Sequence, residues 1–439
     1  MKRALVIALS ALLALSVIAW ADEASSTDDS DTTEAVVVQE AAEGPDESYA
    51  GLDIADLMKI IEEQQSQIEE LSERLVAVEG GLSANTEKVD KLKEQEPLPS
   101  WVPKVKVSGD LRYRYEHINK TGKKSRNRER VRARLGLTGK VNDQVDIKVR
   151  LASGSADPVS TNQTLDGAFS SKSIWLDRAY FDWHPSENMT VYGGKMSNPF
   201  FKPAKSQLLW DGDMNPEGLA VRFEGSGDTK PFLNVAHFWA DERKAAADAR
   251  ILGAQTGLHL KGGSNTKATV GVGYYAFTNV EGQTPLVDAT DSFGNSVNTD
   301  PNTGDITYTT GFREFEAFAE VTTKLGNTPF TVYGDYVTNT DADTDDKGWL
   351  VGANLGKAKN PGEWEFKYNY RRVEADAVLG AFCDSDFIGG GTDGKGHVLG
   401  LGVALTKNTS AGLTYFLNDA GLAGGKSYKR LQFDFKFKF

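Results

Sequence analysis

Large apolar side chains occupy every second position in a series of short segments that runs from Val105 to the end of the chain. The last ten residues, RLQFDFKFKF, are typical: Leu431 and four phenylalanines share one face of an extended chain, and polar residues share the other. A period of two is that of a β-strand, whose successive side chains point to opposite sides. The pattern therefore predicts a β-protein whose strands each have one apolar and one polar face.

Two architectures use such strands, and the lengths of the connections distinguish them. A soluble sandwich buries the apolar faces between two sheets, whereas a membrane barrel turns them to lipid and lines its lumen with the polar faces. Here short links alternate with long ones throughout residues 104–439, as periplasmic turns and external loops do in a closed barrel. The runs between the links number about sixteen, each of about 9–13 residues, which suits tilted crossings. We therefore predict an all-β transmembrane barrel of about sixteen antiparallel strands over 104–439.

The first residues have the features of an export signal. Lys2 and Arg3 precede an apolar run, and the run ends in Ala19-Trp20-Ala21, with small residues at the positions that a signal peptidase recognises. This pattern predicts a signal peptide over 1–21, with a short membrane anchor as the alternative. Residues 22–51 are mostly acidic and small, and we expect an acidic flexible linker there.

The net charge of −13 belongs to the N-terminal part of the chain. Residues 22–97 hold 22 acidic and 5 basic residues, whereas residues 98–439 hold 40 and 42. The main body is therefore nearly neutral and lacks the basic excess that nucleic-acid binding requires. Cys383 is the only cysteine, so a disulfide framework is excluded.

A seven-residue repeat predicts an α-helical coiled coil over 52–96, placed in the periplasm. One core position is occupied by Ile54, Ile61, Ile68, Leu75, Leu82 and Val89, and the other by Leu57, Gln64, Leu71, Val78, Asn85 and Leu92. Ile with Leu favours dimers, the mixed layers also allow trimers, and a single amphipathic helix on another surface is the further alternative. The prolines of 97–103 are expected to form a stiff connector.

Several stretches resemble the "putative porin" family of Gram-negative outer membranes: VSGDLRYRYE (107–116), RNRERVRARLGL (126–137), LDRAYFDW (176–183), and YGGKMSNPFF followed by LWDGDMNPEGLAV (192–221). The coiled coil is similar to that of phosphate-selective porins. The resemblance implies trimeric, water-filled channels in the outer membrane. The terminal strand, with Phe435, Phe437 and Phe439, also resembles the signal that outer-membrane barrels present to their assembly machinery.

The lumen face of the first three strands is expected to be strongly basic. It holds Arg112, Arg114, Arg128, Arg130, Arg132, Arg134, Lys148 and Arg150, and farther round the barrel Glu314, Glu316 and Glu320 supply opposite charge. Rows of guanidinium groups at a narrow place attract anions and repel cations. A structural ion-pair network that stiffens the wall is the alternative, and the residues leave both open.

The external link over 197–216 is too apolar for a free loop. It contains Phe200, Phe201, Leu208, Leu209 and Trp210. We expect it to fold into the lumen and form a constriction, with Lys202, Lys205, Asp211 and Asp213 near the narrowest point. A loop that contacts another subunit or latches the surface is the alternative.

The remaining motifs carry little chemistry. Carboxylates at alternate positions in 341–346 and 211–218 could hold Ca²⁺ in external loops, but neither stretch has the full twelve-residue pattern, and solvated loop tips are the alternative. No other cofactor is expected. The sequence contains no nucleophile elbow, paired zinc ligands or phosphate-binding loop, so no enzymatic activity is expected.

These patterns together predict an outer-membrane porin that passes small hydrophilic solutes or ions by diffusion, with a preference for anions. The expected partners are the lipid bilayer, two further copies of the chain, the barrel-assembly machinery and peptidoglycan. The first alternative is a structural barrel that tethers the outer membrane to the cell wall through its coiled coil. The second is a secreted carbohydrate-active or adhesive β-protein.

Overall fold

The computed structural model describes residues 54–93 and 102–439, and the chain divides into two units, Met1–Glu96 and Pro97–Phe439. The predicted signal peptide (1–21) and acidic linker (22–51) lie outside the described residues, as do residues 97–101 of the proline connector. The connector's last residues, together with Lys104, form a short 3-10 turn over Val102–Lys104.

The described part of the first unit is one helix, α2 (Ile54–Lys93), of 40 residues. It confirms the helix predicted within 52–96, with slightly shorter bounds. Ile61, Ile68 and Leu75, which the heptad places on one stripe, are 53%, 66% and 60% exposed. The assembly of this stripe with other copies stays a prediction. Among the described residues, no helix is long and apolar enough to cross a membrane.

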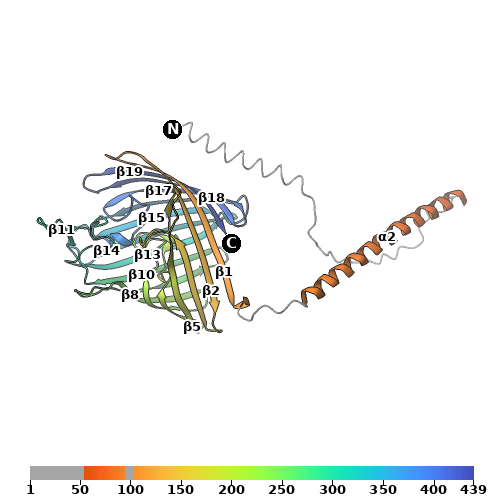
Figure 1. The fold of residues 1–439 in the computed structure, drawn as a ribbon, viewed down its shortest axis with the longest axis horizontal. Coiled ribbons are helices and arrows are strands. Elements are labelled where there is room, and N and C mark those ends of the chain that lie inside the picture. The colour runs from red at the N-terminus through yellow and green to blue at the C-terminus, as the bar shows by residue number, and fades with distance from the viewer. Residues whose placement is uncertain (1–53, 94–101) are drawn as a thin grey trace. The chain divides into compact units, whose positions relative to one another are not determined.

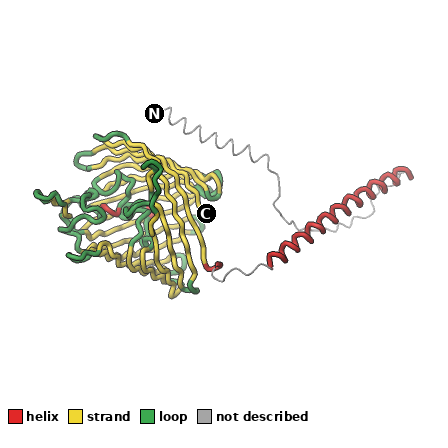
Figure 2. Tube along the Cα trace, viewed as in Figure 1, coloured by secondary structure: helices red, strands yellow, loops and turns green. Residues whose placement is uncertain are grey.

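The second unit is a closed antiparallel β-barrel (Figures 1 and 2). The described sheet has 17 strands, of which β4 (Gln163–Thr164) is a two-residue strand on β2; without it, sixteen strands form the wall. They are β1 (Val105–Lys120), β2 (Arg126–Lys140), β3 (Val145–Ser153), β5 (Ile174–Ser186), β6 (Met189–Lys195), β7 (Glu217–Glu224), β8 (Thr229–Asp241), β9 (Ala249–Gly262), β10 (Thr266–Thr278), β13 (Phe312–Leu325), β14 (Thr328–Asn339), β15 (Lys347–Gly356), β16 (Trp364–Val373), β17 (Gly394–Thr406), β18 (Thr409–Ala420) and β19 (Lys426–Lys438). A separate hairpin pairs β11 (Val297–Thr299) with β12 (Ile306–Tyr308).

Each wall strand pairs with the next one along the chain, and β19 pairs with β1. We call this last pairing the closing seam. Closure is what a bilayer demands, because an open sheet edge in hydrocarbon would leave backbone N–H and C=O groups without partners. The structure thus confirms the predicted class and strand number.

The connections alternate in length mostly as predicted, and the exception is 357–363, which is as long as 340–346 and longer than 121–125 and 421–425. One end of the barrel has the short turns 141–144, 187–188, 225–228, 263–265, 326–327, 357–363 and 407–408. The other end has the segments 121–125, 154–173, 196–216, 242–248, 279–311, 340–346, 374–393 and 421–425. By the rule for bacterial barrels, the short turns face the periplasm and the longer loops face outward.

The two faces of the wall have opposite character, as β1 shows. Leu111 and Tyr113 point outward and are 43% and 39% exposed, whereas Arg112 and Arg114 point inward and are 7% and 5% exposed. A soluble protein would bury the first pair and expose the second. This inversion fits a wall with lipid outside and polar groups inside.

The lumen is partly filled by its own loops. The 196–216 loop and the 374–393 loop fold inward, and Phe200, Trp210 and Phe382 join an apolar core with inward side chains of the wall. The Phe200 ring lies 4.8 Å from that of Tyr275, and it fits because position 253 is glycine: a Cβ there would lie 2.5 Å from the Phe200 ring. The inward course of the 196–216 loop agrees with the sequence prediction.

Candidate functional site

The register of β1 and β2 brings the predicted arginines into one array. Across this pair Arg112 is opposite Arg132, and Arg114 is opposite Arg130. Like charges directly opposite each other destabilise a sheet. The array can therefore exist only where carboxylates or mobile anions offset the repulsion.

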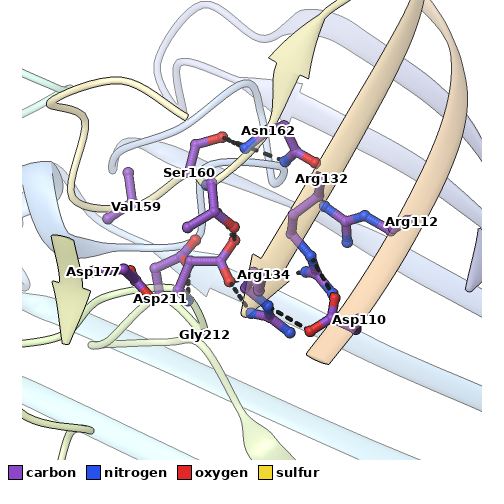
Figure 3. Close-up of polar contacts among 12 residues, drawn as sticks. Asp110, Arg112, Arg132, Arg134, Val159, Ser160, Asn162, Asp177, Asp211 and Gly212 are labelled. Atoms are coloured by element: carbon purple, nitrogen blue, oxygen red, sulfur yellow. Dashed lines mark hydrogen bonds and ion pairs between the residues drawn. The ribbon is translucent and has the colours of Figure 1, made fainter. Parts of the chain in front are cut away.

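Asp110 offsets two of these charges at the periplasmic end of the array. Its carboxylate oxygens lie 2.7 Å from Arg132 Nη2 and 2.7 Å from Arg134 Nε (Figure 3). The sequence places Asp110 two residues before Arg112, so the same alternation that turns the arginines inward turns this carboxylate inward as well.

Glu116 has the corresponding role at the external end. It is fully buried, and its carboxylate oxygens lie 2.5 Å from Arg128 Nε, 2.5 Å from Arg430 Nη2 and 3.8 Å from Arg130 Nη1. Arg430 belongs to β19, so this group joins three strands around the closing seam.

Arg114 is paired from two directions. Asp434 on β19 accepts from its Nε at 2.6 Å, and Asp386 of the 374–393 loop lies 3.2 Å from its Nη1. Burial alone would raise the pKa of Asp386, but the guanidinium groups of Arg430 and Arg114 hold this pKa well below its usual value. The inner loop is thereby tied to the closing seam.

Arg112 differs from the other predicted cations of the basic wall. It is the only one of those eight without a carboxylate within ion-pair distance in the described chain. Its Nη2 donates to Asn162 Oδ1, and its Nε has no hydrogen-bond partner among the described residues. Arg112 is therefore a buried cation with one neutral partner.

The charge balance of the whole network shows the same excess. Seven cations (Arg114, Arg128, Arg130, Arg132, Arg134, Arg430 and Lys436) share five carboxylates (Asp110, Glu116, Asp213, Asp386 and Asp434), and Arg112 adds an eighth, unpaired cation. Burying charge without compensation is costly. The network consequently carries more positive than negative charge.

The 154–173 and 196–216 loops face this wall (Figure 3). Asp213 of the 196–216 loop lies 3.3 Å from Arg134 Nη1 and accepts from Thr161 Oγ1 at 3.1 Å. Burial alone would raise the pKa of Asp213, but the guanidinium groups of Arg132, Arg134 and Arg112 together hold this pKa below its usual value. Asp213 therefore faces the basic wall, and its place at the narrowest point of the lumen stays a prediction.

The other predicted residues of this loop take different places. Lys202 is largely covered and donates to the carbonyl oxygen of Asp211 at 3.2 Å, whereas Lys205 is exposed and has no ion pair among the described residues. Burial lowers the pKa of Lys202. Asp211 is buried and accepts from the backbone N–H of Ser385 at 3.0 Å, so it links the 196–216 and 374–393 loops, and it has no ion pair with an arginine among the described residues.

The predicted acidic wall requires correction. Glu314 and Glu316 point inward but are only 1% and 2% exposed, because the inner loops cover them. Glu314 accepts from the backbone N–H of Leu379 at 2.9 Å, and Glu316 accepts from Tyr275 Oη at 2.7 Å. Glu320 accepts from the backbone N–H of Ala204. Glu314 and Glu320 hold the inner loops, and Glu314 and Glu316 present no charge to an open lumen.

Lys148 and Arg150 on β3 face a cavity of about 370 Å³ on the basic wall. Lys148 is paired with Asp182 and Arg150 with Asp177, both on β5. The inward side chains that line the cavity include Asp110, Arg134, Lys148, Arg150 and Arg178. Sequence analysis did not single out Arg178, although it lies inside the quoted stretch LDRAYFDW.

Two carboxylates of the 341–346 stretch have other partners. Asp341 lies 3.2 Å from Arg313, and Asp346 lies 3.0 Å from Lys347. Within residues 54–93 and 102–439, no three acidic, histidine or cysteine side chains gather as metal ligands would. Ca²⁺ binding therefore stays a sequence prediction without structural support.

The terminal phenylalanines lie on the outside of the closing seam. Phe437 and Phe439 are 43% and 71% exposed, and the backbone of Phe439 pairs with Gly109 through two hydrogen bonds of 3.1 Å. Their recognition by the assembly machinery stays a prediction.

Solved structures of outer-membrane proteins are similar to this chain. The high-pH structure of OprB from Pseudomonas putida aligns with 76% of this chain and 94% of its own, at 12% identity and a TM-score of 0.53. OmpF of Salmonella typhi, in complex with daunomycin, aligns over 76% and 97% at 12% identity and a TM-score of 0.47. At 12% identity the likeness to OprB shows the fold alone. No curated protein sequence matches the chain.

The family model described as "Putative porin" matches residues 118–309 and 303–439, which together are more than half of the chain. The match covers every wall strand after β1. The barrel fold and the family both indicate an outer-membrane channel. The chain belongs to the putative porin family.

Proposed function

We propose that the barrel is a passive channel for small hydrophilic solutes with a preference for anions. The observation that carries the preference is Arg112, a buried guanidinium with no carboxylate partner in a network of eight cations and five carboxylates. An anion about 4 Å from one unpaired guanidinium gains roughly 4 kcal/mol at an effective dielectric constant near 20. This gain offsets part of the cost of removing water from a permeating anion.

The surroundings of Arg112 suit a transient stop for an anion. Arg130 Nη2 lies 3.4 Å from Ser160 Oγ and 3.4 Å from the carbonyl oxygen of Asn162, so the 154–173 loop supplies neutral polar groups beside the cations. Hydroxyl and amide groups exchange hydrogen bonds with a passing ion without holding it as a second charge would. Weak, multiple contacts are what conduction requires.

Planar-bilayer recordings in a KCl gradient test the proposal. The wild-type reversal potential should show chloride permeating faster than potassium, and Arg112→Gln should shift the permeability ratio several-fold toward potassium. Arg313→Gln is the matched control, because Arg313 is an exposed residue of β13 and should leave the ratio unchanged. A cation-selective wild-type channel would refute the anion preference. Absence of conductance would refute the channel itself and favour the tethering alternative.

We also propose that three copies of the chain assemble, with α2 in the periplasm as a coiled coil. The support is the exposed heptad stripe of α2, since burial of one Leu or Ile side chain stabilises by about 1.5–3 kcal/mol. The proposed contacts with peptidoglycan and the barrel-assembly machinery rest on the sequence alone.

A further inference from the structure

The outer surface beside the closing seam shows where the membrane boundary lies. Outward positions are apolar from Val105 to Tyr115 on β1, and on β19 up to Leu431. Ten residues of strand span about 33 Å, which at the tilt of such strands gives an apolar band of about 25 Å. The next outward residues toward the loops are His117 on β1 and Lys429 on β19, which lie at headgroup level.

Just beyond this boundary the two hairpins beside the seam carry a basic patch, which we call the rim patch. It consists of Lys123 and Lys124 in the β1–β2 loop and Lys429 at an outward position of β19. Lys120, Arg126 and Lys426 lie at inward positions of their strands and border the patch on the lumen side. These three patch lysines and the three bordering cations are all exposed, and none has an ion pair among the described residues. The outward carboxylate below them, Glu129, accepts a hydrogen bond of 2.5 Å from Tyr113 Oη.

The rest of the external rim is different. Arg243 is paired with Asp241, Arg250 with Asp248, and Lys347 with Asp346. The loop over 340–346 is strongly acidic. Lys244 is exposed and without an ion pair in the 242–248 loop, but it stands alone among the paired cations there, so at the described rim the unpaired cations cluster at the closing seam.

We infer that the rim patch binds the phosphate groups of an anionic glycolipid in the outer leaflet. The lysines supply compact positive charges that attract phosphates at a membrane surface. Directly below, Tyr113, Tyr115 and Phe433 face outward and offer apolar surface to acyl chains. A glycolipid can place its phosphates on the rim patch and its acyl chains on the aromatic side chains beneath it. A free anion can contact only the rim patch.

The placement of the patch gives the lipid a structural role. Its cations come from both sides of the pairing between β1 and β19, so one lipid with two phosphates can contact both hairpins. Such a lipid holds the seam closed at its external end. This inference requires the barrel to lie in the outer membrane with its longer loops outward, and it does not depend on whether the lumen conducts.

The test uses the full-length protein in phosphatidylcholine vesicles with and without bis-phosphorylated lipid A. Heat-modifiable migration gives the unfolding midpoint. Lipid A should raise the wild-type midpoint by several degrees, and Lys123→Gln/Lys124→Gln/Lys429→Gln should lose most of this shift. The control Lys324→Gln/Lys357→Gln/Lys359→Gln removes the same charge from the opposite end of the barrel and should keep the shift.

Three further results complete the test. Inorganic phosphate at the same phosphate concentration should give no shift, and a shift equal to that of lipid A overturns the assignment to a lipid. Equal shifts in all three proteins, or no shift in the wild type, also overturn the proposal. If the triple variant fails to fold, Lys124→Gln alone should weaken the binding of fluorescent lipid A at least twofold; unchanged binding counts against the patch.

Discussion

Arg114 and Asp434 face each other across the closing seam and form a two-point ion pair. Arg114 Nε lies 2.6 Å from Asp434 Oδ1, and its Nη2 lies 2.8 Å from Asp434 Oδ2. Both side chains are buried, and the two residues are 320 positions apart in the chain. A planar guanidinium that meets a carboxylate at two points fixes the register as well as the charge. This pair therefore specifies how the first strand meets the last.

Breaking the pair should destabilise the barrel. Asp434→Asn leaves Arg114 with Asp386 as its close partner, so we expect a loss near the lower end of the range for buried pairs, about 3 kcal/mol. Heat-modifiable migration in detergent measures the change. Asp143→Asn, at an exposed periplasmic turn, is the control and should leave the midpoint unchanged. An unaltered midpoint in Asp434→Asn would show that the pair contributes nothing to closure.

Releasing the 196–216 loop should widen the channel. Phe200→Ala removes a ring that packs against Tyr275 and the bare backbone of Gly253, at a cost of about 3–5 kcal/mol to the packing of the loop. Single-channel conductance should rise while the barrel remains heat-modifiable. Phe169→Ala, at a fully exposed position of the 154–173 loop, should leave conductance unchanged. If Phe200→Ala also leaves it unchanged, the loop does not limit the flow.

The contact between the inner loops should loosen as pH rises. Burial, and next the carboxylate of Asp384, raises the pKa of Asp211 well above its usual value. Below the unfolded-state pKa, about 3.9, the carboxyl is protonated in both states. Above it the folded state keeps a proton that the unfolded state has lost, so stability falls until the folded-state pKa is passed. The contact is therefore tightest in acid and weaker toward neutral pH.

The single cysteine reports this loosening. Cys383 is buried with its Sγ 3.5 Å from the carbonyl oxygen of Leu208, so it can be labelled only when the inner loops part. Labelling of the wild type, relative to Asp211→Asn at the same pH, should rise from pH 5 to pH 8. The comparison cancels the pH dependence of the thiol reaction itself. If the ratio of the two labelling rates does not change with pH, titration of Asp211 does not cause the loosening.

Loss of the N-terminal segment tests its role in assembly. Deleting residues 22–97 removes the heptad stripe of α2, and we expect trimers to dissociate at lower detergent concentrations than those of the full chain. Native mass spectrometry across a dilution series gives the populations. If the truncated and full-length chains remain trimeric to the same dilution, the barrel walls alone are responsible for assembly.

Much of the wall was predictable because the bilayer acts on each strand separately. On β1, Leu111 and Tyr113 must face lipid, whereas Arg112 and Arg114 must not. The alternation of apolar and polar residues is therefore visible within the sequence of a single strand. The lengths of the links then fixed the class and the number of strands. The inward course of 196–216 was predictable for the same reason, since its aromatic residues could not remain in water.

The contacts inside the lumen were not predictable, because they join residues far apart in sequence. The side chains of Glu314 and Glu316 point to the lumen side of the wall, as the alternation predicts. Nothing near them in sequence indicates that the 374–393 loop covers them. The pairing of Arg114 with Asp434 depends on which strand closes the ring. Asn162, the partner of Arg112, lies in a loop whose position only the three-dimensional structure gives.

The join between β1 and β19 sets an order of events for biogenesis. β1 can pair with β2 early, but it cannot pair with β19 until β19 has been synthesised and exported. Every nascent molecule therefore passes through a stage in which the second edge of β1 is unpaired. During that interval the edge of β1 must be shielded from other chains in transit. The interval between synthesis of β1 and synthesis of β19 is thus a period in which the topology leaves the chain open to aggregation.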